Sequence, residues 1–120
     1  MSDFLINSIK DSIRNIPDFP VKGVQFKDIT TVLKKPELFS LIVDQMAAHY
    51  ANRGITKVVA IESRGFIIGG ALAYKLGIGF VPVRKPGKLP AETYIQEYEL
   101  EYGTDALEIH RDALGEQDVV

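Results

Sequence analysis

The chain has 120 residues, 46% of them hydrophobic and 25% charged, which is ordinary for one soluble globular domain or part of one. The formal net charge of −2 excludes a bulk basic field for nucleic acid, so any anion must be bound by a local cluster of cations. The lack of cysteine excludes disulfides and thiol catalysis. No apolar run resembles a signal peptide or approaches the roughly 20 residues of a membrane span. We therefore expect a soluble, cytoplasmic protein with neither nucleic acid nor membrane as partner.

The first quarter of the sequence predicts a helix, a loop and a short extended segment. Apolar residues at helical spacing predict an amphipathic helix over residues 3–14, and Ser2 can cap its N-terminus. Residues 15–23 contain prolines and a glycine, so we expect a fixed, irregular loop there. Residues 24–29 are then predicted to form a short extended stretch.

The middle of the sequence predicts a helix followed by a strand–helix–strand unit. The helix begins at Pro36, which suits a first turn, and ends near Gly54, which can adopt the left-handed backbone of a cap. Residues 57–61 form a short, continuously apolar run rich in β-branched residues, as in a strand buried on both faces of a parallel sheet. A further helix over 66–76 and a strand over 80–84 complete the βαβ unit.

The last third of the sequence predicts a loop and a hairpin. Residues 85–90 are rich in glycine, proline and lysine, which favour a loop. Between residues 94 and 102 an aromatic face alternates with an acidic face, as in a β-ribbon. We expect residues 102–105 to turn this ribbon into a second strand over 106–110. Residues 118–120 look like the beginning of a third core strand.

The turn between the first core strand and its helix, Glu62–Phe66, is the first candidate site. Ligands of open α/β sheets bind at the carboxyl ends of the strands. A glycine beside a helix N-terminus offers backbone N–H groups to an anion, and Arg64 could add a bidentate phosphate contact. The alternative is a plain strand–helix turn with a solvated arginine, and the residue types alone do not decide between the two.

An aromatic residue marks the second candidate site, Val24–Asp28. Phe26 could stack on a flat base, because aromatic side chains commonly stack on nucleobases. The same side chain could instead be a hydrophobic plug that holds the first helix. The local pattern alone favours the plug.

Two further segments attract attention by their charge. Arg84–Lys88 has three cations among loop-forming residues, which suits a loop that closes over phosphates, although a solvated surface loop explains the pattern equally well. Glu97, Glu99 and Glu101 lie on the acidic face of the ribbon, where solvation is the ordinary explanation. The two histidines have no metal-ligand partner at useful spacing, and we assign them no role.

Taken together, four motifs resemble those of the adenine phosphoribosyltransferases, in the same order and spacing. The resemblance runs from about Ile13 to Val120 and so covers nearly the whole chain. The motifs are Pro17-Asp18-Phe19-Pro20-x-x-Gly23-Val24-x-Phe26-x-Asp28-Ile29, Glu62-Ser63-Arg64-Gly65-Phe66, Val83-Arg84-Lys85-Pro86-Gly87-Lys88-Leu89-Pro90 and Leu100-Glu101-Tyr102-Gly103.

This resemblance implies an α/β fold of the type I phosphoribosyltransferase kind. Such a fold has a parallel sheet flanked by helices, an N-terminal hood over the base and a mobile β-ribbon loop. The implied reaction belongs to purine salvage and transfers the phosphoribosyl group of phosphoribosyl pyrophosphate to adenine N9, giving AMP and pyrophosphate. The resemblance also implies a homodimer, and Mg²⁺ as a cofactor held mainly through the substrate pyrophosphate rather than by a metal site of the protein.

The resemblance also implies a role for individual residues. Phe26 would stack on adenine, while backbone groups of Gln25 and Lys27 read the edge of the base. Glu101 would exchange a proton with adenine N7, and Tyr102 would close over the site. The residues implied to bind pyrophosphate are Ser63, Arg64 and Gly65 at the turn, with Arg64 also counted as catalytic, and Arg84, Lys85 and Lys88 at the base of the mobile loop.

The family's loop for the ribose 5-phosphate is expected just after Val120. We therefore expect this chain to correspond to the N-terminal two-thirds of such an enzyme, and to be inactive and poorly soluble when made alone. On this interpretation the chain is a single incomplete domain. Its parts are a base-binding hood with the N-terminal helix (1–35), the start of the α/β core (36–84), the mobile loop and hairpin (85–110) and the lead-in to a further strand (111–120).

Three other interpretations stay open. The chain could belong to a phosphoribosyltransferase for another purine base, although Val24–Asp28 looks adenine-type. It could be a non-catalytic, purine-responsive regulator on the same fold, although the net charge of −2 and the lack of a helix-turn-helix pattern speak against nucleic-acid binding. It could also be a fragment that acts only as an interaction piece.

Overall fold

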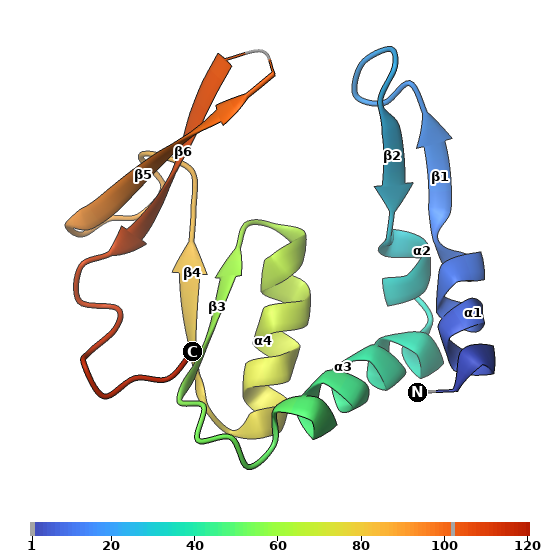
Figure 1. Cartoon of the computed structure of the whole chain (residues 1–120), viewed down its shortest axis with the longest axis horizontal. Helices are drawn as coiled ribbons and strands as arrows, with labels where there is room; N and C mark the ends of the chain where they lie inside the picture. The colour runs from blue at the N-terminus through green and yellow to red at the C-terminus, as the bar shows by residue number, and fades with distance from the viewer. Residues whose placement is uncertain (1, 102) are drawn as a thin grey trace. The chain divides into compact units, whose positions relative to one another are not determined.

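The computed structural model describes residues 2–101 and 103–120, and it separates into two compact units, Met1–Met46 and Ala47–Val120. The first unit contains a two-stranded ribbon and helices, and the second contains the end of the last of these helices, a parallel strand pair, a further helix and a long hairpin (Figure 1). Within the described residues no helix is both long and apolar enough to cross a membrane.

The first unit begins with the predicted amphipathic helix, α1 (Asp3–Ser12). The Ser2 hydroxyl accepts a hydrogen bond from the Leu5 N–H at 3.3 Å, so the predicted N-terminal cap is confirmed. The helix ends two residues earlier than predicted, because Ile13 already has extended backbone with φ −71° and ψ 127°.

The prediction of an irregular loop over residues 15–23 is wrong for its first part, which forms a strand. Ile16 lies opposite Phe26 in an antiparallel ribbon, and Pro17 ends the first strand, where a missing N–H is tolerated. The prolines therefore lie at the end of the first strand and in the turn that follows, not in the middle of a strand. Local composition does not reveal this, because the partner strand lies beyond the turn. The ribbon consists of β1 (Arg14–Pro17) and β2 (Gln25–Asp28).

Two helices follow the ribbon. α2 (Thr30–Leu33) is a single turn that the sequence pattern does not predict, and the Thr31 hydroxyl donates to the Ser12 carbonyl at the end of α1. α3 (Pro36–Tyr50) begins at its proline as predicted, and Gly54 beyond its end has the predicted left-handed backbone, with φ 69°. The buried apolar residues of the first unit are Val32, Leu38 and Val43.

The second unit is built on a parallel pair of strands. β3 (Lys57–Ile61) and β4 (Gly79–Val83) pair along their whole length, and α4 (Arg64–Leu76) packs against both strands. The helix begins two residues earlier than predicted, which brings Arg64 into its first turn. It ends at Gly77, whose φ of 71° is the expected left-handed cap. The predicted α/β fold with a parallel sheet is confirmed.

The prediction that β3 is buried on both faces is wrong within the described residues. The strand is mostly half-buried, and Ile61 at its end is 50% exposed. One edge of β3 pairs with β4. At the other edge the N–H groups of Thr56 and Lys57 bond to the Val119 carbonyl, at 2.8 and 3.4 Å. Residues 118–120 thus lie beside the start of β3, but they do not form the predicted strand.

A long antiparallel hairpin completes the second unit. It pairs from Thr93 and His110 at its base to Leu100 and Gly103 at its tip. The second strand therefore begins at Gly103 rather than at residue 106 as predicted. Two backbone hydrogen bonds between Arg84 and Glu108, of 3.0 and 2.7 Å, join the base of the hairpin to the end of β4. Its strands are β5 (Thr93–Leu100) and β6 (Gly103–His110).

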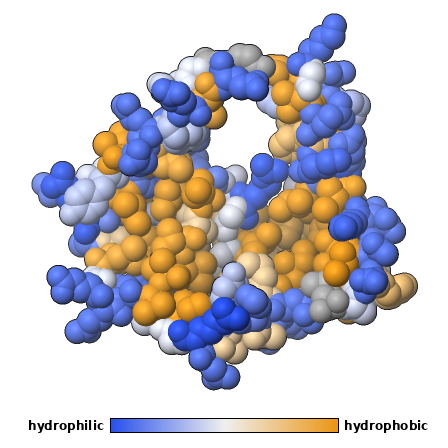
Figure 2. All heavy atoms as spheres, viewed as in Figure 1, coloured by the Kyte–Doolittle hydropathy of each residue, from blue (hydrophilic) through white to orange (hydrophobic). Residues whose placement is uncertain are grey.

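Apolar side chains remain exposed on both units. The space-filling view shows broad hydrophobic areas over the helices of the first unit and over the strands and helix of the second (Figure 2). Tyr74 on α4 is 90% exposed, and Tyr94 on β5 is 60% exposed. The aromatic face predicted for β5 is thus largely open to solvent in the described part of the chain.

The close approach of α4 to β3 depends on Gly69. A Cβ at this position would lie 2.8 Å from the Ala60 Cβ and 3.1 Å from the Phe80 Cε2. Both distances are below the optimal separation of about 3.5–4.0 Å between carbon atoms, so a side chain here would push the helix away from the strands. The neighbouring Gly70 has nothing within 4 Å of such an added Cβ.

We expect Gly69→Ala to lower the free energy of unfolding by up to about 2 kcal/mol. Overpacking costs about 1–3 kcal/mol, and the better helix propensity of alanine offsets about 1 kcal/mol of this. The matched control is Gly70→Ala, which adds the same methyl group without a contact and should raise the free energy of unfolding by up to about 1 kcal/mol. Urea unfolding followed by circular dichroism measures both. Equal effects of the two substitutions would contradict the close approach.

Candidate functional site

The β1–β2 ribbon carries the residues predicted to bind a base. Phe26 in β2 is half-buried, and its ring packs edge-to-face against Phe19 with a centroid distance of 5.1 Å. Gln25 and Lys27 on either side are exposed, because side chains alternate along a strand. The ribbon therefore presents an aromatic pair, of which Phe19 is 48% exposed, flanked by polar residues.

A buried carboxylate anchors the end of β2. Asp28 is 7% exposed and accepts hydrogen bonds from the Thr30 hydroxyl and N–H, at 2.7 and 2.9 Å, and from Arg14 Nη2 and Nε, at 2.5 and 3.0 Å. These bonds, with that of the Thr30 hydroxyl foremost, lower the pKa of Asp28 from an ordinary 3.8 to about 2. Because Arg14 lies in β1, the carboxylate ties together both strands of the ribbon and the start of α2.

The turn between β3 and α4 has the arrangement expected of an anion site. Ser63 immediately precedes the helix and makes no side-chain cap, and Arg64 and Gly65 are its first residues. The side chains of Ser63 and Arg64 are exposed, and the Glu62–Ser63 peptide bond is cis. The N–H groups of a helix N-terminus favour an anion, so the turn and its arginine could bind a phosphate group together.

The Glu62 carboxylate joins this turn to the basic loop. Its Oε1 accepts a hydrogen bond from the Lys85 N–H at 2.8 Å and from Arg84 Nε at 3.3 Å. The backbone hydrogen bond from Lys85 is the main cause of the lowered pKa of Glu62, and the charge of Arg84 adds to it against the effect of burial. The guanidinium carbon of Arg84 also lies 5.9 Å from the centroid of the Phe66 ring. The Glu62–Phe66 turn and the Arg84–Lys88 loop, which the sequence predicts as separate sites, are thus brought together.

The side chain of Lys85 extends from the turn to the hairpin. Its ammonium forms an ion pair with Asp105 in β6 and a hydrogen bond of 3.3 Å with the Tyr98 hydroxyl in β5. Tyr98 and Asp105 lie directly opposite one another in the hairpin register. The contact with Asp105 raises the pKa of Lys85, and the same contact lowers the pKa of Asp105, so the pair is charged at neutral pH.

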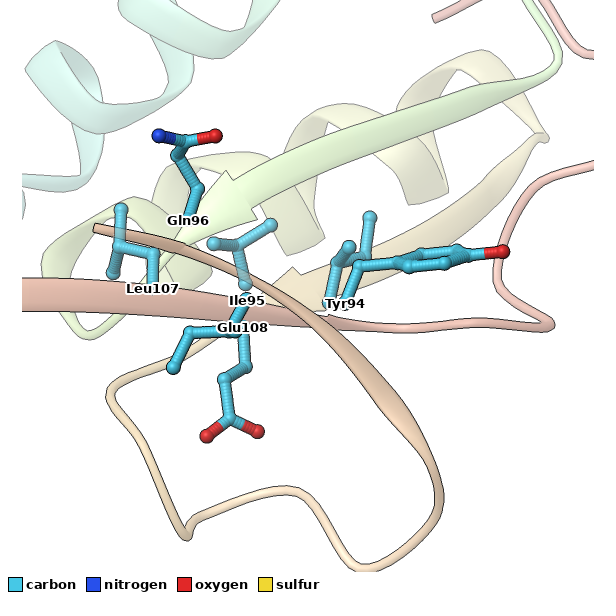
Figure 3. Close-up of a pocket in the computed structure, with 7 residues that line it drawn as sticks. Tyr94, Ile95, Gln96, Leu107 and Glu108 are labelled. Atoms are coloured by element: carbon cyan, nitrogen blue, oxygen red, sulfur yellow. The ribbon is translucent and has the colours of Figure 1, made fainter. Parts of the chain in front are cut away.

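Glu108 in β6 fixes the loop that carries Lys88. Its Oε1 accepts a hydrogen bond from the Gly87 N–H at 3.2 Å, and its Oε2 accepts one from the Thr93 hydroxyl at 2.6 Å. In Figure 3 the Glu108 carboxylate points away from the hairpin strands toward this loop. The Lys88 N–H bonds to the Lys85 carbonyl at 3.4 Å, and the Lys88 residue is exposed. The base of the loop is therefore held by β6.

A shallow groove of about 320 Å³ also lies along the hairpin. Side chains of both strands line it, among them Tyr94, Ile95 and Leu107 (Figure 3). None of the residues predicted to bind adenine or pyrophosphate lines this groove. We therefore do not count it as part of the candidate site.

Some of the predicted site residues do not lie beside Glu62 and the backbone of Arg84 and Lys85. Glu101 is exposed at the tip of the hairpin, directly after the end of β5, whereas the backbone of Arg84 and Lys85 lies at its base. Residues 25–27 belong to the first unit. Tyr102, which the resemblance assigns to closure over the site, lies outside the described residues.

Sequence reasoning misses the carboxylates that organise these segments. Glu62 and Asp28 lie within the quoted motifs, yet the pattern assigns them no partner. Asp105 and Glu108 lie on the hairpin, where acidic side chains are indistinguishable from a solvated face. The available signal is the hairpin register, because it places Asp105 opposite Tyr98 and thus on the face of the predicted aromatic residues.

No protein-family model matches the chain. Individual proteins do match it. Over 108 residues the chain is 61% identical to the adenine phosphoribosyltransferase of Chlorobaculum tepidum, a match that covers 88% of this chain and 61% of that protein. Over the residues that match, the chain is a homologue of the adenine phosphoribosyltransferases.

Two solved structures of this family match the fold. The adenine phosphoribosyltransferase of Thermoanaerobacter pseudethanolicus is 58% identical with a TM-score of 0.85, covering 90% of this chain and 63% of that one. The enzyme of Giardia lamblia, complexed with 9-deazaadenine, is 43% identical with a TM-score of 0.91, covering 96% of this chain and 64% of that one. The expected type I phosphoribosyltransferase-like fold is thereby confirmed.

The chain spans less than two thirds of the length of the three adenine phosphoribosyltransferases compared above, between 61% and 64%. Its structure places Arg64, Arg84 and Lys85 around the Glu62 turn, and it places Phe26 on an aromatic ribbon. The roles of these residues in binding and catalysis stay predictions.

The Asp28 anchor predicts how stability depends on pH. Because folding lowers the pKa of Asp28, the charged carboxylate stabilises the fold above about pH 4, and this contribution is lost as the pH falls through about 2. Asp28→Asn should therefore be less stable than the unsubstituted protein at neutral pH. It should also lose less stability between pH 4 and pH 2, although Asp118, whose pKa is likewise lowered to about 2, still titrates there.

Thermal unfolding at a series of pH values, followed by circular dichroism, measures this dependence. The control is Asp112→Asn, which replaces an exposed carboxylate of the second unit and should follow the curve of the unsubstituted protein. If Asp28→Asn also follows that curve, Asp28 does not anchor the ribbon.

Proposed function

We propose that the protein, at the length of its relatives, transfers the phosphoribosyl group of phosphoribosyl pyrophosphate to adenine N9. The products are AMP and pyrophosphate, which places the reaction in purine salvage. The observation that supports this best is the Glu62 carboxylate, which holds the Arg84 side chain and the Lys85 backbone N–H beside the turn where α4 begins. Arg84 and Arg64, the first residue of α4, are two cations beside a helix N-terminus, and they suit a diphosphate better than a neutral ligand.

The chemistry of the leaving group explains why such a site is needed. The bond between ribose C1 and adenine N9 forms while the bond from C1 to the pyrophosphate oxygen breaks, and that electron pair leaves with the pyrophosphate. Fixed donors and cations that face the leaving group stabilise the charge as it develops. We assign this task to the backbone and side chains of Ser63, Arg64 and Gly65 and to Arg84, Lys85 and Lys88.

The base would bind on the β1–β2 ribbon. Phe26, held edge-to-face by Phe19, offers an aromatic surface for adenine, and the backbone of Gln25 and Lys27 would read the edge of the base. The Giardia lamblia enzyme of this family binds 9-deazaadenine, a purine-like ring of the same shape. We assign Glu101 to proton exchange with adenine N7, and Tyr102 to closure over the site.

Mg²⁺ would bind mainly through the substrate. In the described part of the chain no three histidine or acidic side chains are grouped so that they could hold a metal ion. The Glu62 carboxylate of the turn already contacts Arg84, and the Asp105 carboxylate of the hairpin already contacts Lys85. When bound to pyrophosphate, the metal would neutralise part of its charge. We further propose a homodimer, which analytical ultracentrifugation tests.

The central experiment uses a chimera in which the Chlorobaculum tepidum enzyme supplies the part of its sequence that this chain does not match. With Mg²⁺ and phosphoribosyl pyrophosphate, the chimera should form AMP from adenine, and hypoxanthine or guanine should not replace adenine. Within it, Phe26→Ala should raise the adenine KM about 5-fold to 150-fold, since stacking on a base contributes about 1–3 kcal/mol.

Two comparisons make this experiment decisive. Phe4→Ala removes an aromatic ring that is 78% exposed on α1, and it should leave both KM values unchanged. Phe26→Ala should leave the KM for phosphoribosyl pyrophosphate nearly unchanged. A folded chimera that turns over no purine base would contradict the proposed function, and an unchanged adenine KM in Phe26→Ala would return Phe26 to a packing role.

A second prediction concerns the acidic hairpin. In the chimera, Glu101→Gln should lower kcat by about 10²–10⁴-fold, the usual contribution of a positioned acid or base. Glu99→Gln is the matched control, because Glu99 is an exposed carboxylate near the same hairpin tip, and it should have little effect. Steady-state kinetics measures both. Similar values for the two variants would mean that the acidic face only solvates the hairpin.

A further inference from the structure

The cations that the proposed function assigns to pyrophosphate already have protein partners. Arg84 pairs with Glu62, at 3.3 Å, and Lys85 pairs with Asp105. The ammonium of Lys85 has further contacts, since it hydrogen-bonds the Tyr98 hydroxyl and lies 5.9 Å from the centroid of that ring. The Lys85 and Asp105 side chains are 42% and 30% exposed, so an incoming anion can reach the pair.

We propose that Asp105 is the counter-ion that sets how tightly Lys85 binds a diphosphate. This inference rests on the proposed function, which makes pyrophosphate the anion at the β3–α4 turn. The anion has to take the ammonium from Asp105. Its observed affinity is therefore the affinity of a released Lys85 reduced by the fraction of molecules in which the ion pair is formed.

The backbone of Lys85 allows this exchange without a change of fold. Its N–H is bonded to Glu62 at 2.8 Å, beside the turn where α4 begins, while its side chain reaches the hairpin. A change of side-chain rotamer therefore redirects the ammonium from Asp105 toward the turn. Neither β4 nor the hairpin has to move.

The surroundings of Asp105 allow this carboxylate to give up the Lys85 ammonium to an incoming anion. Glu62 binds the backbone of Lys85, so it still organises the loop after the ammonium has moved. The Asp105 carboxylate accepts from the Ala106 N–H at 2.8 Å, and the Tyr98 hydroxyl lies opposite it in register. Both donors remain when Lys85 leaves, so the carboxylate keeps hydrogen-bond partners. The lowered pKa of Asp105, caused first by Lys85 and next by the Ala106 N–H, agrees with these contacts.

The test is isothermal titration calorimetry of inorganic pyrophosphate into the full-length chimera and its variants. Asp105→Asn should tighten pyrophosphate binding about twofold to fivefold, the range expected when a partly exposed ion pair no longer competes. Lys85→Gln should weaken binding. On the Lys85→Gln background Asp105→Asn should change nothing further, because the effect passes through that ammonium.

A matched control separates this effect from general charge. Glu97→Gln removes an exposed carboxylate from the same hairpin and should leave the affinity unchanged. Unchanged or weaker binding by Asp105→Asn overturns the inference, as does an equal gain on the Lys85→Gln background. Asp105→Ser, which also removes the charge, replaces Asp105→Asn if circular dichroism shows that the latter is unfolded.

The outcome also separates this inference from the proposed function. If the chimera forms no AMP while Asp105→Asn still tightens pyrophosphate binding through Lys85, the proposed function fails and the inference stands. If no form of the chimera binds pyrophosphate, the inference is overturned whether or not the chimera forms AMP.

Discussion

One carboxylate fixes how the turn after β3 and the loop after β4 lie together in the second unit. A parallel strand pair brings the carboxyl ends of β3 and β4 to the same edge, but it does not fix where the segments after those ends go. Glu62 removes that freedom, because it follows β3 directly and accepts hydrogen bonds from Arg84 and Lys85, which follow β4. The helix N-terminus and the basic loop are therefore held at one place. Glu108 extends this arrangement by fastening the same loop to β6.

The parts of the fold that sequence predicts best are those with a local cause. α3 begins at its proline and α4 ends at Gly77, because a first turn tolerates proline and a left-handed cap favours glycine. β3 has the predicted bounds because a short apolar run between turns has few alternatives. By contrast, β1 depends on a partner beyond a turn. The half-exposed state of Ile61 likewise depends on which segments cover it, so composition around either segment could not show the outcome.

The residues of the candidate site also divide into those with a local sequence signal and those that depend on partners far along the chain. Arg64 and Phe26 stand out in the sequence because an arginine at a helix start and an aromatic residue in a polar stretch are unusual locally. Their roles come from the family resemblance. The carboxylates could not be found by either route, since Asp105 in a strand has the same local pattern whether it is solvated or paired with Lys85. Only the three-dimensional contacts distinguish these two cases.

The pairing of Arg84 with Glu62 and of Lys85 with Asp105 has a consequence for how an anion finds the site. Opposite charges in contact act at a distance as dipoles, whose potential decays faster than that of separate cations. Beyond a Debye length of about 8 Å at physiological ionic strength, salt screens what remains. These two pairs would therefore attract a polyanion little from afar, and it would first have to collide with them. Its capture is then a local exchange of partners, with an association rate that varies little with salt.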